Sequence, residues 1–137
     1  MKYLLDTNAL SALMRGDPAI VTQLGALAKD DVFVAHPTLA EIEYGLARMP
    51  RSRRRASYRA RFDLIRNELQ HAAWSDEVDA QFGAIKAELE RRGTRLEDFD
   101  LAIAAHALAL EAVLITSDRA HMARIPGLLV QGWKDEG

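Results

Sequence analysis

The sequence predicts an α/β protein built on a parallel sheet. Short runs of aliphatic, aromatic and β-branched residues, such as "VFVA" at 32–35 and "VLIT" at 113–116, are uninterrupted rather than alternating, as in strands that are covered on both faces. Longer segments between these runs repeat apolar residues at helical spacing. Because strands and helices alternate along the chain, the strands are expected to pair in parallel.

Each element has its own local signal. The first strand is expected at Tyr3–Leu5, and Leu128–Val130 is a candidate for a strand beyond the two runs above. Asp17 followed by Pro18 marks a helix start, since Asp is a favoured N-cap and Pro fits the first helical position. The four other expected helices begin at Thr38, carry the arginines between Arg48 and Arg66, run from Ser75 to about Arg92 before Gly93, and span about Asp98 to Glu111.

Length and composition restrict the class of protein. The 137 residues, 49% of them apolar, suit a single domain over 1–137 with a substantial core. No apolar stretch approaches the roughly 20 residues needed to cross a bilayer, so a soluble protein without a membrane anchor is expected. The N-terminus does not resemble a signal peptide, and cysteine is absent. These features favour a cytoplasmic protein and exclude disulfides, thiol catalysis and zinc–cysteine sites.

Positive charge is concentrated in one segment. The formal net charge is only −2, yet eight arginines and a single acid, Asp63, lie between Arg48 and Arg66. Either a polyanionic partner or an ordinary solvated helix face explains this segment, and the sequence leaves both open. In and just after it, an apolar set predicts a buried stripe, consisting of Phe62, Leu64, Ile65 and Leu69.

Two acids are expected at the carboxyl edge of the sheet, where open parallel sheets bind ligands. Asp6 directly follows the first strand, although an Asp at this place also suits a helix N-cap. Glu41 lies in "TLAE", which matches a capping box with Thr38 and still places Glu41 in the first turn of a helix at the same edge. Glu43 points about 200° around that helix from Glu41 and should lie elsewhere.

Two further acids follow the same rule. Glu97, Asp98 and Asp100 cluster at the start of an apolar helix, where Asp98 is the natural cap and Asp100 adjoins the buried-looking run "LAIAAHALAL". A buried carboxylate there costs several kcal/mol unless it is paired or bound to a metal. Asp118 comes shortly after the strand at 113–116, and a turn or helix cap is its ordinary explanation.

Four carboxylates at one edge repel one another unless a cation neutralises them. An all-oxygen donor set with no cysteine favours a hard ion, Mg²⁺ or Mn²⁺, over zinc. Such an ion suits hydrolysis or transfer at phosphorus, because it activates water and stabilises a charged transition state.

Four spaced motifs, "LLDTNAL", "TLAEIEYG", "DFDLAIAAHAL" and "LITSDRAHMARIPGL", resemble those of PIN domains, specifically the VapC-type toxins of toxin–antitoxin pairs. The resemblance extends from Asp6 to about Leu129. It implies three layers, with a parallel sheet of four to five strands between helices. It departs from the family pattern at Ser117 and Asp118, where the family often has two asparagines, and at His121 and Met122, where the family often has an acid followed by Phe.

The resemblance also implies a function. It points to a Mg²⁺-dependent endoribonuclease, with Mn²⁺ as a substitute, that cuts structured RNA such as tRNA or rRNA and pairs with a cognate antitoxin, as a homodimer. Carried over by position, the catalytic and metal-binding residues are Asp6, Glu41, Asp100 and Asp118. Asn8 and Thr116 match the residues that support them. The arginine segment then supplies RNA-binding candidates, Arg51, Arg53, Arg54, Arg55 and Arg59, unless it docks the antitoxin.

Other classes remain open on the sequence alone. A free-standing PIN-type RNA-processing nuclease would have the same motifs. An aspartate-nucleophile phosphatase normally has a second acid two residues after the first, where this chain has Asn8. A non-enzymatic RNA-binding module explains the arginines but not four acids at one edge.

Overall fold

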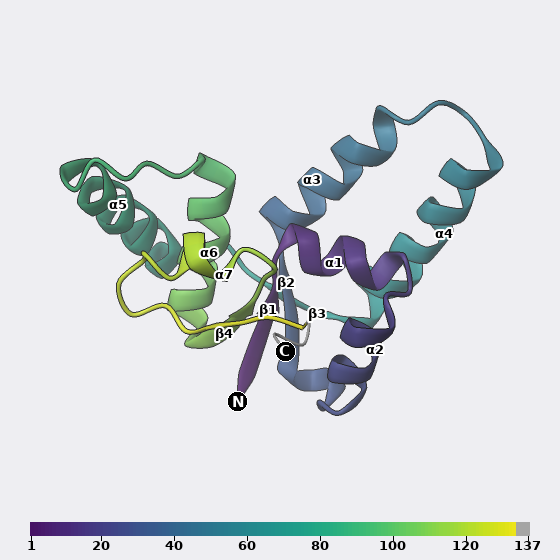
Figure 1. Ribbon diagram of the computed structural model, residues 1–137, viewed down its shortest axis with the longest axis horizontal. Helices are drawn as coiled ribbons and strands as arrows, with labels where there is room; N and C mark the ends of the chain where they lie inside the picture. The colour runs from purple at the N-terminus through teal and green to yellow at the C-terminus, as the bar shows by residue number, and fades with distance from the viewer. Residues whose placement is uncertain (134–137) are drawn as a thin grey trace.

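Figure 1 shows the computed structural model, which describes residues 1–133. Its centre is a five-stranded sheet in the order β3-β2-β1-β4-β5, and every neighbouring pair is parallel. The predicted parallel α/β fold is therefore confirmed. The strands are β1 (Lys2–Leu5), β2 (Val32–Ala35), β3 (Gln70–Ala72), β4 (Ala112–Ile115) and β5 (Val130–Gln131).

Two strands differ from the sequence prediction. β3 was not expected, because its Gln70 and His71 are polar and exposed at the edge of the sheet, where a strand needs only one buried face. The predicted strand at Leu128–Val130 is shifted, and β5 pairs through Val130 and Gln131 instead. Both are edge strands, whose apolar signal is weak.

Helices connect successive strands and cover the sheet. Asp17 caps α2, Ser75 caps α5, and Gly93 follows α5 with a positive φ of 71°, so these predicted helix ends are confirmed. In chain order the helices are α1 (Thr7–Met14), α2 (Pro18–Gly25), the 3₁₀ turn η1 (Lys29–Asp31), α3 (His36–Ala47), α4 (Arg53–Glu68), α5 (Asp76–Arg91), α6 (Asp98–Leu110) and α7 (Arg119–Met122).

The sheet separates two apolar cores. On one face, Leu4 and Leu114 pack with α5, α6 and α7. On the other face, Leu5, Val34 and Ile115 pack with α1, α2, α3 and α4. Figure 1 shows the same division, with α5 and α6 to one side of the strands and α1, α2 and α4 to the other. The predicted three layers follow from this division, because the central strands bury side chains on both faces.

The apolar stripe predicted on the arginine-rich helix is only partly right. Phe62 is fully buried, and Ile65 and Leu69 pack against the same core. Leu64 is 68% exposed, so its inclusion in the buried stripe was wrong. Two residues after Phe62 on a helix, Leu64 points about 200° away from it. None of the helices within residues 1–133 is long and apolar enough to cross a membrane.

Candidate active site

The strand order places the site. β2 and β3 lie on one side of β1, and β4 and β5 lie on the other, so the chain reverses its direction of winding between β1 and β4. In open α/β sheets, ligands bind outside the carboxyl ends of the strands at such a reversal. Asp6 follows β1 here, and its N–H donates to the Ile115 carbonyl at 3.1 Å. Asp118 lies three residues beyond the end of β4, at the same reversal.

Asp6 is both a helix cap and a constrained acid. Its carboxylate accepts a hydrogen bond from the Ala9 N–H at 2.8 Å, which caps α1. Burial raises the pKa of Asp6 above its ordinary value, and the nearby charges of Asp100 and Asp118 raise it further. Hydrogen bonds from Thr116 and from the Ala9 amide oppose this rise in pKa. The two interpretations of Asp6 are therefore compatible.

Glu41 is held by a different partner from the one predicted. Its carboxylate accepts a hydrogen bond from the Thr7 hydroxyl at 2.6 Å, across 34 positions of sequence. The predicted start of the helix at Thr38 and its capping box were wrong, because α3 begins at His36 with Ala35 as N-cap. Pro37 fits the first turn of the earlier start. The Thr38 hydroxyl is instead buried and has no partner in the described part of the chain.

Asp100 lies near the beginning of α6 and is partly buried. Burial raises its pKa above the ordinary value, and the charges of Glu41 and Glu97 raise it further, while His121 lowers it. Asp118 also contributes to the rise in the pKa of Asp100. The acid candidates from β1, α3, α6 and the end of β4 therefore share one electrostatic environment.

Asp98, another acid at the start of α6, forms an ion pair with α5 and does not cap the helix. Glu97, not Asp98, occupies the N-cap position of α6, so the predicted cap was wrong. Asp98 pairs with Lys86 of α5 at 3.0 Å. This ion pair joins the start of α6 to α5, and it removes Asp98 from the set of candidate ligands.

Of the two residues expected to support the acids, Thr116 hydrogen-bonds to them and Asn8 does not, within the part of the chain that the structure describes. Thr116 is fully buried, hydrogen-bonds to Asp6 and accepts the Asp118 N–H at 3.0 Å. Asn8 is exposed, and its side chain makes no hydrogen bond within residues 1–133. Asp118 is also exposed, and its carboxylate does not cap α7. Thr116 thus links Asp6 and Asp118, whereas the predicted support from Asn8 is not seen.

Sequence reasoning missed three participants. Thr7 was not singled out within "DTN", because nothing local shows that its hydroxyl reaches another helix. Glu97 acts on Asp100 and was noted only as an extra acid near it. His121 of α7 lowers the pKa of the same carboxylate through its charge, and the sequence analysis had named it only as a departure from the family pattern.

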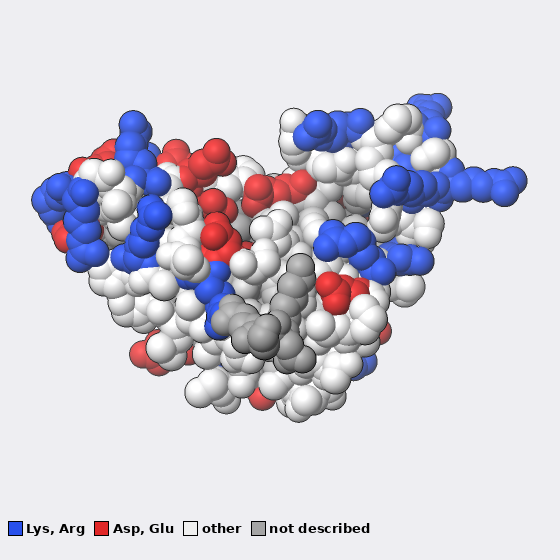
Figure 2. Space-filling model, in the orientation of Figure 1, with Lys and Arg blue, Asp and Glu red and all other residues white. Residues whose placement is uncertain are grey.

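One of the four candidate acids, Glu41, borders two hollows in the surface. Glu41 and Glu97 border a cavity of about 670 Å³ together with Arg95 and Phe99. A second hollow, of about 310 Å³, also includes Glu41 and runs between α1, α3 and α4 over a mainly apolar lining. Figure 2 shows acidic side chains at the middle of this face and basic side chains on the projections to either side. The charge pattern suits a polyanion that crosses an acidic centre.

The arginine-rich helix is partly committed to the fold. Arg59 forms an ion pair with Glu43 and lies 3.4 Å from Asp63, and Arg66 lies 3.5 Å from Glu43. Arg61 donates to the Met14 carbonyl at 3.0 Å. Glu43 lies away from Glu41, as predicted. The guanidinium of Arg59, one of the five RNA-binding candidates, is therefore already engaged in the contact between α3 and α4.

The donor chemistry fits a hard divalent cation, although no cage of ligands is preformed. Within residues 1–133, no group of three or more acidic, histidine or cysteine side chains is arranged to hold a metal ion as it stands. Mg²⁺ usually takes one or two carboxylates and completes its shell with waters and substrate phosphates. Besides burial, the charges of Asp100 and Asp118 raise the pKa of Asp6, and those of Glu41, Glu97 and Asp118 raise the pKa of Asp100. A divalent ion bound by Asp6 and Asp100 would relieve this repulsion.

The fold and these residues match a known family. The model of the PIN domain matches residues 3–128. The chain belongs to the PIN-domain family. Among curated relatives, this PIN domain is 30% identical to "Ribonuclease VapC2" of Rickettsia felis over 135 residues, which cover 97% of this chain and 98% of the relative. It is 26% identical to the "tRNA(fMet)-specific endonuclease VapC" of Salmonella typhimurium over 137 residues, with the same coverage.

Two solved VapBC structures also match this chain. The structure of VapBC2 from Rickettsia felis bound to a DNA fragment from its promoter matches with a TM-score of 0.88 and 28% identity, covering 98% of this chain and all of the other. VapBC-1 from nontypeable Haemophilus influenzae matches with a TM-score of 0.84 and 26% identity over the same shares. The resemblance of this PIN domain to the VapC type is therefore confirmed along nearly its whole length.

Proposed function

We propose that this PIN-domain protein is a metal-dependent endoribonuclease, the toxin of a toxin–antitoxin pair, which hydrolyses phosphodiester bonds in structured RNA and so inhibits translation. The proposal rests on one observation: four acids share one electrostatic environment at the edge of the sheet where the strand order reverses between β1 and β4. These acids are Asp6, Glu41, Asp100 and Asp118. The names of the VapC relatives support ribonuclease activity. They favour this function over an aspartate-nucleophile phosphatase or a non-enzymatic RNA-binding module.

Asp6 and Asp100 are proposed as the most direct ligands of Mg²⁺, for which Mn²⁺ substitutes, while Glu41 and Asp118 complete or orient the shell. Such an ion would activate a water for in-line attack on phosphorus and neutralise the charge that develops there. Thr7 keeps the Glu41 carboxylate turned toward α1, and Thr116 keeps Asp6 in place. These hydroxyls hold the acids in position before substrate arrives.

The proposed substrate is tRNA or rRNA. A tRNA is the first to test, because the printed name of the Salmonella relative specifies tRNA(fMet). A tRNA-cutting activity would place the protein in the cytoplasm. The proposed nuclease unit is the single domain 1–137, of which the family model covers residues 3–128.

The proposed partners are a cognate antitoxin and a second copy of the chain in a homodimer. The solved VapBC relatives support an antitoxin. The hollow between α1, α3 and α4 is its proposed seat, because Met14, Ile42 and Leu46 give it an apolar lining that extends to Glu41. An antitoxin seated there would cover the catalytic edge. A small neighbouring gene for such a partner would favour the toxin over a free-standing RNA-processing nuclease.

The test is cleavage by the purified protein of total tRNA and of rRNA, with Mg²⁺, with Mn²⁺ and with EDTA. We expect cleavage only with a divalent ion, and none from Asp100→Asn. Asp76→Asn is the matched control, because it makes the same chemical change at an exposed position on α5. Cleavage in EDTA, or by Asp100→Asn at the rate of the control, would show that the proposed site is wrong.

A further inference from the structure

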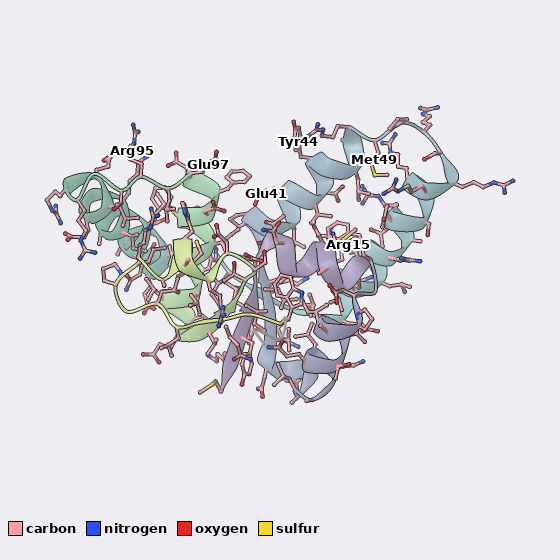
Figure 3. The ribbon with its side chains drawn as sticks, viewed as in Figure 1. Arg15, Glu41, Tyr44, Met49, Arg95 and Glu97 are labelled. Carbon is pink, nitrogen blue, oxygen red and sulfur yellow. The ribbon has the colours of Figure 1, made fainter. Side chains whose placement is uncertain are left out.

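Two arginines outside the arginine-rich helix lie on opposite sides of Glu41. Arg15 is the C-cap residue of α1 and lines the hollow between α1, α3 and α4. Arg95 lies between α5 and α6 and lines the larger cavity. Glu41 borders both hollows, so it stands between the two arginines. Figure 3 shows Glu41 and Glu97 between Arg95, which precedes α6, and Arg15 at the end of α1.

Neither guanidinium forms a contact that stabilises the fold within the described residues. Within residues 1–133, the side chains of Arg15 and Arg95 make no ion pair, hydrogen bond or ring contact, and both are exposed. Arg59 and Arg66 differ from them, because both are bound to Glu43. Arg54 also lines the hollow with Arg15, but its guanidinium lies 5.5 Å from the centre of the Tyr58 ring.

The acidic side chains at the centre of this face (Figure 2) indicate a role for Arg15 and Arg95 in binding RNA phosphates. When the scissile phosphate of an RNA strand lies at the acids beside Glu41, its neighbouring phosphates would lie over the rims of the two hollows that Glu41 borders. The acidic centre repels these phosphates, and a cation on each rim offsets the repulsion. Guanidinium groups suit this role, because their forked donors match phosphate oxygens.

We infer that Arg15 and Arg95 bind the phosphates on either side of the scissile phosphate, so that one RNA strand runs from the α1 rim across Glu41 to the α5–α6 rim. This inference rests on the proposed ribonuclease function and names residues that position its substrate. Both arginines lie outside the set of RNA-binding candidates predicted from the sequence, which consists of Arg51, Arg53, Arg54, Arg55 and Arg59. Phosphate contacts position a nucleic acid without reading its sequence, so both arginines act on all RNA substrates alike.

The test measures kcat and KM on a fluorogenic RNA oligonucleotide with Mg²⁺ over a series of KCl concentrations. For Arg15→Gln and Arg95→Gln we expect a KM that is roughly five-fold higher, as for the loss of one exposed ion pair, with kcat unchanged. The plot of log(kcat/KM) against log[KCl] should become shallower by about 0.7 for each lost phosphate contact, and by about 1.4 in the double variant.

Two controls separate binding from structure. Arg92→Gln removes the same charge from the end of α5, where Arg92 pairs with Glu88 at 2.9 Å, and it should keep the wild-type salt slope. Arg15→Lys keeps the charge beside the end of α1 and should keep most of the slope. A purely structural role of Arg15 would lower the melting temperature without changing the slope.

The outcomes also distinguish the inference from the proposed function. Wild-type protein that cuts the oligonucleotide, together with arginine variants that keep its KM and salt slope, would overturn the inference and leave the ribonuclease standing. Wild-type protein that cuts no RNA with either ion would overturn both. A shallower slope in Arg95→Gln and Arg15→Gln, but not in Arg92→Gln, would support the proposed path.

Discussion

The Thr7 hydroxyl on α1 donates to the Glu41 carboxylate on α3 at 2.6 Å and joins the two helices at the candidate site. Both residues also line the hollow between α1, α3 and α4. Glu41 is the candidate acid with a side-chain hydrogen bond from another helix, so its orientation depends on a residue that carries no charge. Loss of a group that orients a metal ligand typically reduces metal affinity or activity by about 10- to 100-fold.

Replacing this hydroxyl should therefore reduce activity. We expect Thr7→Val, which preserves the shape of the side chain, to lower kcat/KM about ten-fold through misplacement of Glu41. Thr7→Ser keeps a hydroxyl and should retain most of the activity. Steady-state cleavage of a fluorogenic RNA measures both variants, and an equal loss in the two would show that the hydrogen bond is not the cause.

Asp6 should destabilise the metal-free protein through its charge and stabilise it through its hydrogen bonds. Asp6→Asn removes the charge but leaves an oxygen that can accept the Ala9 N–H, so its melting temperature in EDTA should equal or exceed that of the wild type. Asp6→Ala also loses the cap and should be about 1 kcal/mol less stable than Asp6→Asn. Urea denaturation of both variants measures the difference. A markedly lower stability of Asp6→Asn would favour a purely capping role.

The raised pKa values of Asp6 and Asp100 predict a specific pH dependence. Burial favours the protonated form of both acids in the folded protein, so the folded state holds protons that the unfolded state has already released above the ordinary pKa of 3.8. The stability contribution of these groups therefore falls as pH rises from 3.8 to their raised pKa, and it stays low above that value.

Melting curves in EDTA from acidic to neutral pH check this dependence. The melting temperature of the double variant Asp6→Asn, Asp100→Asn should exceed that of the wild type. This difference should grow as pH rises through that window and vanish at its acidic end. A difference that does not change with pH would rule out titration of these two carboxylates as its source.

The contact between α3 and α4 should show the opposite pH dependence. The hydrogen bond from Arg59 lowers the pKa of Glu43, so this pair stabilises the protein above the ordinary range of the carboxyl and is lost as pH falls through the lowered pKa. Both side chains are more than a third exposed, so a double-mutant cycle of Glu43→Gln and Arg59→Gln should give less than about 1 kcal/mol. High salt should reduce this coupling energy, and a coupling independent of salt would argue against an ion pair.

The sequence by itself determined the elements with strong local signals. Runs such as "VFVA" must be buried on both faces, and caps such as Asp17 and Ser75 act on backbone groups a few residues away. It also determined that Asp6 and Asp118 come after strands, which in a parallel sheet means the same edge. These features follow from neighbours along the chain, so no knowledge of strand order was needed.

Tertiary structure alone decided which of these residues meet. The reversal of strand order at β1 and β4 brings Asp6 beside Thr116 and close enough to Asp118 for their charges to interact. The packing of α1 on α3 allows Glu41 to accept a hydrogen bond from Thr7, where the sequence had predicted an interaction with Thr38. The packing of α4 on α3 pairs Arg59 with Glu43. Arg15 and Arg95 have no partner within residues 1–133. Hydrogen bonds and charges act over a few ångströms in space, and folding sets those distances between residues that are far apart in the sequence.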